Sequence, residues 1–314
     1  MSVNELPESD TDLALRCAQM FFLEDLSKIE IAEALGVSRF KVARLLTAAR
    51  ELGLITVKIN EPTSSGRSLG DELQAQFGLE DVAIVPSTRS LEALGQAGAE
   101  MLGRHLQEGD VVGVGWGRTV NSVVSAMSRF PTVSGVDVVQ LAGGVVTPGP
   151  DFDPTGQAAR LAAALSGSLT PLHAPAFLGS AATRRALLTE PSIAAALDAF
   201  EHLTIAILGI GALGTDADSA LVAADTLPAK AREELAKRGA TADLACHFFA
   251  EDGTLVRGWE SRTLSVGLPA LRAARVRIGV AAGESKAAAV RAVLRSGTIN
   301  VLVTDTTCAR AVLG

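Results

Sequence analysis

Basic side chains are concentrated in one short segment near the N-terminus, at Arg39, Lys41 and Arg44. Their guanidinium and ammonium groups are donors that suit phosphate oxygens and the acceptor atoms of nucleic-acid base edges. The segment 28–58 holds six basic and three acidic residues, a net charge of +3, whereas the whole chain carries −7 and the remainder therefore −10. A basic segment in an acidic protein indicates contact with nucleic acid.

Two helices joined by a turn are expected to carry these side chains. Ser27 and Glu30 have the spacing of a capping box at the start of the first helix, which ends at Gly36, and Ser38 can cap the second. A supporting helix is expected over 13–22 and a short strand over 54–59. The pattern predicts a helix-turn-helix that enters a DNA major groove, with the DNA-binding residues Ser38, Arg39, Phe40, Lys41, Arg44 and Arg50. The alternative is an ordinary amphipathic helical hairpin.

A glycine-rich loop forms the second group of residues that could do chemistry. It follows the predicted strand 111–114, opens a helix expected over 119–127, and consists of Gly115, Trp116, Gly117, Arg118 and Thr119. Glycines let backbone N–H groups approach an anion, and the helix N-terminus adds partial positive charge. The loop matches neither a Walker A nor a dinucleotide fingerprint. It therefore suits a single phosphate, and the alternative is a tight turn without a ligand.

Other predicted strand ends carry residues that can join this site. Glycine turns follow the strands 136–141 and 203–208, and polar side chains fall at further turns, so that the additional candidates are Gly143, Gly144, Gly211, Asp243, Asp252 and Lys286. Asp243 could accept hydrogen bonds from sugar hydroxyls or cap a turn. Asp252 fits a hairpin turn and could also lie near the mouth of a site. Lys286 could meet a phosphate or be a solvated lysine of a first helical turn, and Asp305 is expected to cap a helix.

Strands and helices alternate along most of the chain and must position these ends. We expect a helix-turn-helix domain over 1–60, a linker over 61–68 and an α/β domain over 69–314 with a parallel-rich sheet covered by helices. Ligands bind such sheets where the carboxyl ends of the strands meet loops. The 314 residues are 48% hydrophobic and 20% charged, which indicates a globular protein of about two domains.

Composition also excludes several classes of protein. Three cysteines and four histidines are scattered without metal-ligand spacing, so neither a disulfide framework nor a metal is expected, and no cofactor is implied. No apolar run is long enough to span a membrane, and the acidic N-terminus lacks a signal peptide. We therefore expect a cytoplasmic protein.

The combination of motifs resembles the SorC family of bacterial transcriptional regulators, also described as SorC/DeoR-type. The resemblance runs from about residue 12 to 314 and rests on Ile31-Ala32, Leu35 to Arg39, Val42, Arg44 to Leu46, Ala49-Arg50, Phe248-Phe249, Asp252-Gly253, Ala282-Gly283, Lys286, Ile299 to Asp305 and Ala309. It implies a C-terminal domain related to sugar-phosphate isomerases and deaminases. It also implies a dimeric or tetrameric regulator of carbohydrate or polyol catabolism that senses a phosphorylated sugar.

The resemblance also implies residue roles. The loop Gly115 to Thr119 and Lys286 should hold the phosphate, and the sugar should be lined by Gly143, Gly144, Gly211 and Asp252. Two features depart from the family pattern. Ala242 stands where many members have Gly, and Trp116 and Arg118 add bulk and charge to the loop.

Three functions follow as hypotheses. The first is an effector-responsive regulator that binds a double-stranded DNA operator. The second is a phosphosugar isomerase or deaminase, for which Glu284, Asp243 and Asp252 are possible carboxylates, although no obvious catalytic pairing accompanies them. The third is a non-responsive DNA-binding protein whose large domain only oligomerises. An isomerisation assay and ligand-induced stabilisation discriminate between them.

Overall fold

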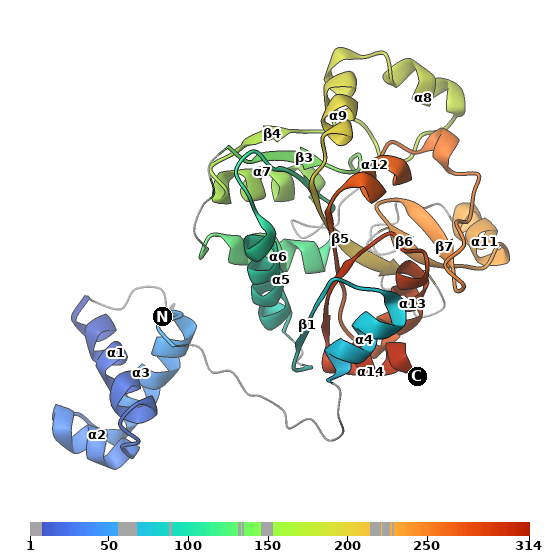
Figure 1. Ribbon diagram of the computed structural model, residues 1–314. Coiled ribbons are helices and arrows are strands. Elements are labelled where there is room, and N and C mark those ends of the chain that lie inside the picture. Colours follow the sequence, from blue (N-terminus) through green and yellow to red (C-terminus); the bar gives the residue numbers. More distant parts are fainter. Residues whose placement is uncertain are drawn as a thin grey trace. The chain divides into compact units, whose positions relative to one another are not determined.

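The chain forms two compact units, Met1–Ser64 and Ser65–Gly314. The computed structural model describes residues 8–55, 68–87, 90–130, 133, 135–145, 153–213, 221, 227 and 229–314 (Figure 1). Most of the predicted linker 61–68 therefore lies outside the described residues, as does most of the predicted strand 54–59. Leu54 and Ile55, which open that strand, are not in a strand and instead pack on the core of the first unit.

The described residues 8–55 of the first unit form three helices, α1 (Glu8–Phe22), α2 (Lys28–Leu35) and α3 (Arg39–Glu51). The predicted capping box at the start of α2 is confirmed, because Ser27 N–H donates to Glu30 Oε2 at 2.8 Å and Glu30 N–H donates to Ser27 Oγ at 3.3 Å. Gly36 ends α2 with φ of 62°, a left-handed conformation that glycine adopts without strain. A small core holds the helices together and includes Ala14, Cys17, Ile31, Val42 and Leu45.

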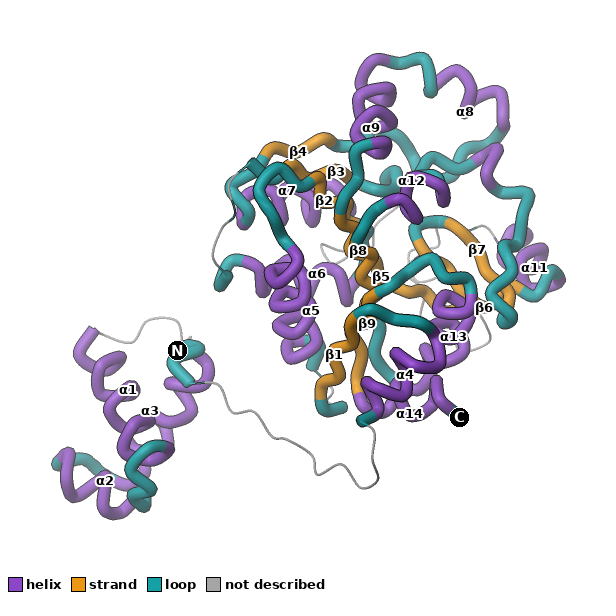
Figure 2. The backbone as a smooth tube through the Cα atoms, in the orientation of Figure 1, coloured by secondary structure: helices purple, strands orange, loops and turns teal. Residues whose placement is uncertain are grey.

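The second unit is built on a parallel sheet with the strand order β1-β9-β8-β5-β2-β3-β4. All neighbours along this path are parallel, which confirms the α/β class and the parallel-rich sheet. The strands are β1 (Asp81–Val85), β2 (Val111–Val114), β3 (Asp137–Gln140), β4 (Ser168–Thr170), β5 (Ile205–Ala212), β8 (Val276–Val280) and β9 (Val301–Asp305). An antiparallel hairpin of β6 (Ala240–Leu244) and β7 (His247–Ala250) pairs with the end of β5 (Figure 2).

Helices cover both faces of the sheet, and side chains of successive residues on β5 alternate between the two cores. Ile205 and Ile207 pack against one set of helices, whereas Ala206 and Leu208 pack against the other. The first set comprises α5 (Glu92–His105), α6 (Arg118–Met127) and α7 (Pro154–Ala164). The second comprises α4 (Leu69–Phe77), α9 (Pro191–Glu201), α12 (Leu268–Ala273), α13 (Ala287–Arg295) and α14 (Thr306–Leu313).

Shorter helices are also present among the described residues of the second unit. None of the described helices is both long and apolar enough for a membrane span. The short helices are α8 (Ala181–Leu187), α11 (Ala229–Lys237) and the 3-10 turns η2 (Glu260–Arg262) and η3 (Glu284–Lys286).

One prediction about β5 is wrong. The sequence pattern ends this strand at Leu208 and places a glycine turn over 209–211, but the strand continues to Ala212 because Ile210, Gly211 and Ala212 pair with β6. Gly209 within the strand serves close packing. A Cβ atom added at Gly209 would lie 3.2 Å from Thr119 Oγ1, so the missing side chain lets the loop before α6 approach β5.

Candidate DNA-reading helix and effector cavity

Helix α3 presents a basic, exposed surface. Ser38 caps the helix by accepting a hydrogen bond from Lys41 N–H at 3.2 Å, as the sequence predicts. The side chains of Arg39, Phe40, Arg44 and Arg50 are exposed. Val42, Leu45 and Leu46 point into the core, which fixes the outward direction of the others.

The sequence places Lys41 on the outer side of α3, but in the structure its side chain is half-buried. Its charge lowers the pKa of Cys17 on α1, although burial of that thiol has the larger effect and raises the pKa overall. The physical reason is the helical period, since Lys41 lies next to the inward-facing Val42 rather than on the outer face with Phe40 and Arg44.

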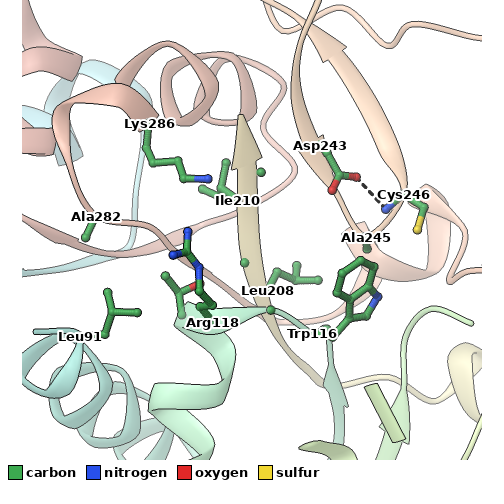
Figure 3. Close-up of a pocket in the computed structure, with 15 residues that line it drawn as sticks. Leu91, Trp116, Arg118, Leu208, Ile210, Asp243, Ala245, Cys246, Ala282 and Lys286 are labelled. Carbon is green, nitrogen blue, oxygen red and sulfur yellow. Dashed lines mark hydrogen bonds between the residues drawn. The ribbon is translucent and has the colours of Figure 1, made fainter. Parts of the chain in front are cut away.

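The second unit contains a cavity of about 270 Å³ at the carboxyl ends of β2 and β5. It joins five segments that are distant in the sequence: Leu91 before α5, the loop before α6, the second half of β5, the β6–β7 turn and the segment that leads into α13 (Figure 3). Eight predicted effector residues line it, namely Gly115, Trp116, Gly117, Arg118, Thr119, Gly211, Asp243 and Lys286. Further lining residues that the sequence interpretation did not include are Leu91, Leu208, Gly209, Ile210, Ala245, Cys246 and Ala282.

One end of the cavity is suited to an anion. Gly117, with φ of 120°, forms the N-cap of α6 and offers no side-chain cap to the first N–H groups of the helix, and Gly117, Arg118 and Thr119 all line the cavity. Gly115 N–H donates to Ile207 O at 2.8 Å and holds the loop on β5. Arg118 and Lys286 bring two cationic groups to the same cavity, and Figure 3 shows both on the side of the strand away from Asp243.

Lys286 is positioned by a network around Asp305. The Asp305 carboxylate accepts hydrogen bonds from Gly283 N–H at 3.0 Å and Cys308 N–H at 2.9 Å, so it caps α14 as predicted and also holds the loop after β8. Lys286 follows this loop at the end of η3, and only 7% of its surface is exposed. Lys286 therefore belongs to the cavity wall and is not the solvated surface lysine that the sequence left as the alternative. Its contact with a phosphate stays a prediction.

Asp243 lies at the opposite wall, on β6. Its Oδ1 accepts a hydrogen bond from Cys246 N–H at 3.0 Å, so the residue also caps the turn, which was the alternative interpretation. Burial raises the pKa of Asp243 to about 7, although the Cys246 hydrogen bond and the Lys286 charge act in the opposite direction. The carboxyl group is therefore close to the midpoint of its titration at neutral pH.

The turn that carries this wall has an unusual backbone. Ala245 and Cys246 have φ of 48° and 66°, left-handed values that residues with a Cβ atom rarely adopt. Both residues line the cavity. Strain of this kind persists where surrounding structure enforces it, and it is concentrated at functional sites.

Three predicted sugar-lining residues lie outside this cavity. Gly143 and Gly144 lie where the chain crosses the segment 174–176, and Gly144 N–H donates to Ala174 O at 2.7 Å. A Cβ atom at Gly143 would lie 2.7 Å from Ala176 N, so the small size of this residue serves backbone packing. Asp252 closes an exposed turn, with Oδ1 accepting from Thr254 N–H at 2.8 Å. No three His, Cys, Asp or Glu side chains come together as metal ligands within the described part of the chain.

Comparison with known proteins decides the family. The model of a sugar-binding domain (Sugar-bind) matches residues 62–314. The transcriptional regulator LsrR of Klebsiella pneumoniae subsp. pneumoniae is 34% identical over 310 residues, which is 97% of this chain and 94% of that protein. The chain belongs to the SorC family of sugar-binding transcriptional regulators. LsrR of Escherichia coli strain K12 is 31% identical over 317 residues, covering 99% of this chain and 98% of that protein.

The structural comparison covers both units of this SorC-family chain. The full-length sorbitol operon regulator SorC from Klebsiella pneumoniae aligns with a TM-score of 0.76 and 27% identity, over 98% of this chain and all of that chain. The family resemblance and the regulator function predicted from the sequence are therefore confirmed: the chain is a DNA-binding transcriptional regulator with a sugar-binding effector domain.

Proposed function

We propose that the cavity at the ends of β2 and β5 binds a phosphorylated sugar or polyol and that this binding changes operator affinity. One observation supports this proposal above the others: the α6 N-terminus, Arg118 and Lys286 share a single cavity with Asp243. The phosphate would lie against the helix N-terminus and the two cations, where N–H donors and charge both favour an anion. The carbohydrate hydroxyls would then reach Asp243.

The size and chemistry of the cavity favour a small polar ligand. Its volume of about 270 Å³ is below the range of roughly 300–1,000 Å³ that is typical of sites for larger organic ligands. A monosaccharide phosphate fits this scale better than a dinucleotide. Asp243 can accept hydrogen bonds from hydroxyl groups as a carboxylate and can donate one when protonated, so it suits a ligand with several hydroxyls.

Catalysis is not part of the proposal. The described lining residues include one carboxyl group, Asp243, and no histidine. Asp252, one of the carboxylates considered for isomerisation, lies in an exposed turn outside the cavity. Aldose–ketose isomerisation needs an acid and a base placed around the substrate, and this set of lining residues favours a sensor.

The regulatory step is proposed to be a population shift in a homo-oligomer, a dimer or tetramer. One helix-turn-helix reads one half-site, and paired modules read pseudo-palindromic DNA. An effector that prefers one arrangement of the oligomer changes operator affinity by its differential affinity for the two arrangements. In the same proposal α3 supplies the operator contacts, with Arg39, Arg44 and Arg50 as donors.

The test is ligand-induced stabilisation followed by DNA binding. A panel of sugar and polyol phosphates is screened by thermal unfolding, where a ligand at 100 times its Kd adds about 2.7 kcal/mol of stability. Lys286→Ala and Thr119→Ala should abolish the response, whereas Asp252→Asn, which changes a residue outside the cavity, should keep it. Fluorescence anisotropy on labelled operator DNA at fixed salt then measures the change in affinity. Equal stabilisation of Lys286→Ala and the unaltered protein would place the site elsewhere.

A further inference from the structure

An aromatic ring is fully presented to solvent on the helix that is proposed to read DNA. Phe40 is 88% exposed, more than the other large apolar side chains that the structure shows at the surface, which range from 38% to 79%. It is the second residue of α3, directly after Arg39. Isolated exposed apolar residues are common on proteins, so the meaning of Phe40 depends on which residues share its face.

Phe40 shares its face with residues suited to base edges. Phe40, Arg44 and Thr47 are exposed and follow helical spacing, and the half-buried Ala43 lies between them along one stripe of the helix. Thr47 Oγ1 donates to Ala43 O at 3.1 Å, so its hydroxyl proton is engaged within the helix. The stripe therefore offers one strong polar donor, Arg44, and one large apolar group, Phe40.

These two groups correspond to different bases in the major groove. Among the four bases only thymine presents a methyl group there, and an aromatic side chain contacts it favourably. Arginine forms its commonest specific contact with O6 and N7 of guanine. Four residues of helix rise about 6 Å, and bases on one strand are about 3.4 Å apart, so Phe40 and Arg44 reach bases about two steps apart.

We propose that Phe40 packs against the 5-methyl group of a thymine in each operator half-site, about two base pairs from a guanine that Arg44 reads. This inference rests on the proposed operator contact of α3 and extends it to the bases that are recognised. Phe40 is thus a specificity residue, whereas Arg39 and Arg50 hold the helix on phosphates.

The expected effect follows from the size of one methyl group. Burial of one such group contributes about 0.8 kcal/mol, which is about a fourfold change in affinity. Two half-sites double this free energy and give about a fifteenfold change when both methyl groups are removed.

The experiment removes the methyl groups and the ring independently. The full-length protein is used to select operators from a pool of random duplexes, and each thymine of the selected operator is then replaced by deoxyuridine. Affinities are measured by fluorescence anisotropy at fixed salt. The unaltered protein should lose about fourfold at one thymine in each half-site. Phe40→Ala should bind more weakly and should lose this sensitivity to deoxyuridine.

Matched variants distinguish loss of the Phe40–thymine contact from a general loss of folding or DNA binding. Phe22→Ala removes a partly exposed ring from α1 and should keep the sensitivity, and Phe40→Leu should keep part of it because an apolar group remains. Because 88% of Phe40 is exposed, its removal takes little from the core, which thermal unfolding checks.

The outcomes distinguish this inference from the function it rests on. If Phe40→Ala keeps the full deoxyuridine effect, or if no thymine matters to the unaltered protein, the thymine contact is overturned. If the thymine contact is overturned but Arg44→Ala still lowers the affinity for operator DNA, the proposed role of α3 in operator binding stands without the thymine contact. If neither Phe40→Ala nor Arg44→Ala changes binding to any selected duplex, the DNA-reading role of α3 fails and this inference fails with it.

Discussion

Substitution of Asp243 by Asn should remove a pH dependence from the stability of the sugar-binding unit. The pKa of this carboxyl is about 7 in the folded protein, against an ordinary value of 3.8, because burial disfavours the charged form. The folded chain then holds a proton that the unfolded chain has released. Stability should therefore fall as pH rises from about 4 to about 7 and change little above that range.

The magnitude follows from the size of the shift. A shift of about three pH units corresponds to about 4 kcal/mol at 1.36 kcal/mol per unit. Asp243 lines a cavity that water can enter, and this solvation reduces the penalty, so we expect a loss of about 2 kcal/mol between pH 5 and pH 8. The substituted asparagine would be uncharged throughout, and its amide oxygen can still accept the hydrogen bond from Cys246 N–H.

Urea unfolding followed by tryptophan fluorescence is the appropriate assay. Both tryptophans of the chain, Trp116 and Trp259, belong to the second unit, so the signal reports on that unit alone. The difference in unfolding free energy between the unaltered protein and Asp243→Asn should widen by about 2 kcal/mol in favour of the variant from pH 5 to pH 8. Parallel pH profiles for the two proteins would show that Asp243 is ionised throughout and would refute the reasoning.

Three further substitutions test the packing and the ion pairing of the second unit. A Cβ atom at Gly95 on α5 would fall on the carbonyl oxygen of Ser122 on α6; Gly95→Ala should therefore lose about 1–3 kcal/mol of unfolding free energy. Gly103→Ala on the same helix, with its nearest neighbour at 3.8 Å, should gain up to about 1 kcal/mol. The buried Asp110 carboxylate accepts two hydrogen bonds from Arg275, at 2.9 and 2.6 Å. Asp110→Ala should lose about 2–3 kcal/mol of unfolding free energy in urea, and an unchanged midpoint would contradict a stabilising contribution from this pair.

The parts of the structure that the sequence predicts well have a local physical signal. Ser27, Ser38 and Asp305 cap helices as expected, because a side-chain oxygen at the right spacing satisfies free N–H groups whatever surrounds it. The parallel strands are short apolar runs, which is typical of strands buried on both faces. The helix-turn-helix carries the first kind of signal, and the loop before α6 directly follows a strand that carries the second.

The missed parts depend on contacts between distant segments. The β6–β7 turn uses Ala245 and Cys246 in left-handed conformations, where the usual sequence signal is Asn-Gly. Glycine has several uses that look alike in a sequence. Gly117 lines the cavity in a left-handed conformation at the start of α6, whereas Gly143 allows two backbones to cross. Only the fold distinguishes these uses. The loop before α6 could be predicted because it directly follows a strand, whereas the lining by Ala245 and Cys246 in the β6–β7 turn could not.

The β6–β7 hairpin divides its work between its two faces, and this has a consequence for how ligand preference can change. Ala242 and Leu244 on β6 are buried in the core, while Asp243 between them lines the cavity. Alternate positions of β6 therefore have separate roles: Ala242 and Leu244 pack in the core, and Asp243 faces the cavity where the ligand is proposed to bind. If the cavity binds the effector as proposed, exchange of Asp243, Ala245 and Cys246 between related regulators should change the ligand preference while the sheet and α3 stay as they are, which makes this hairpin a suitable target for evolutionary change and for biosensor design.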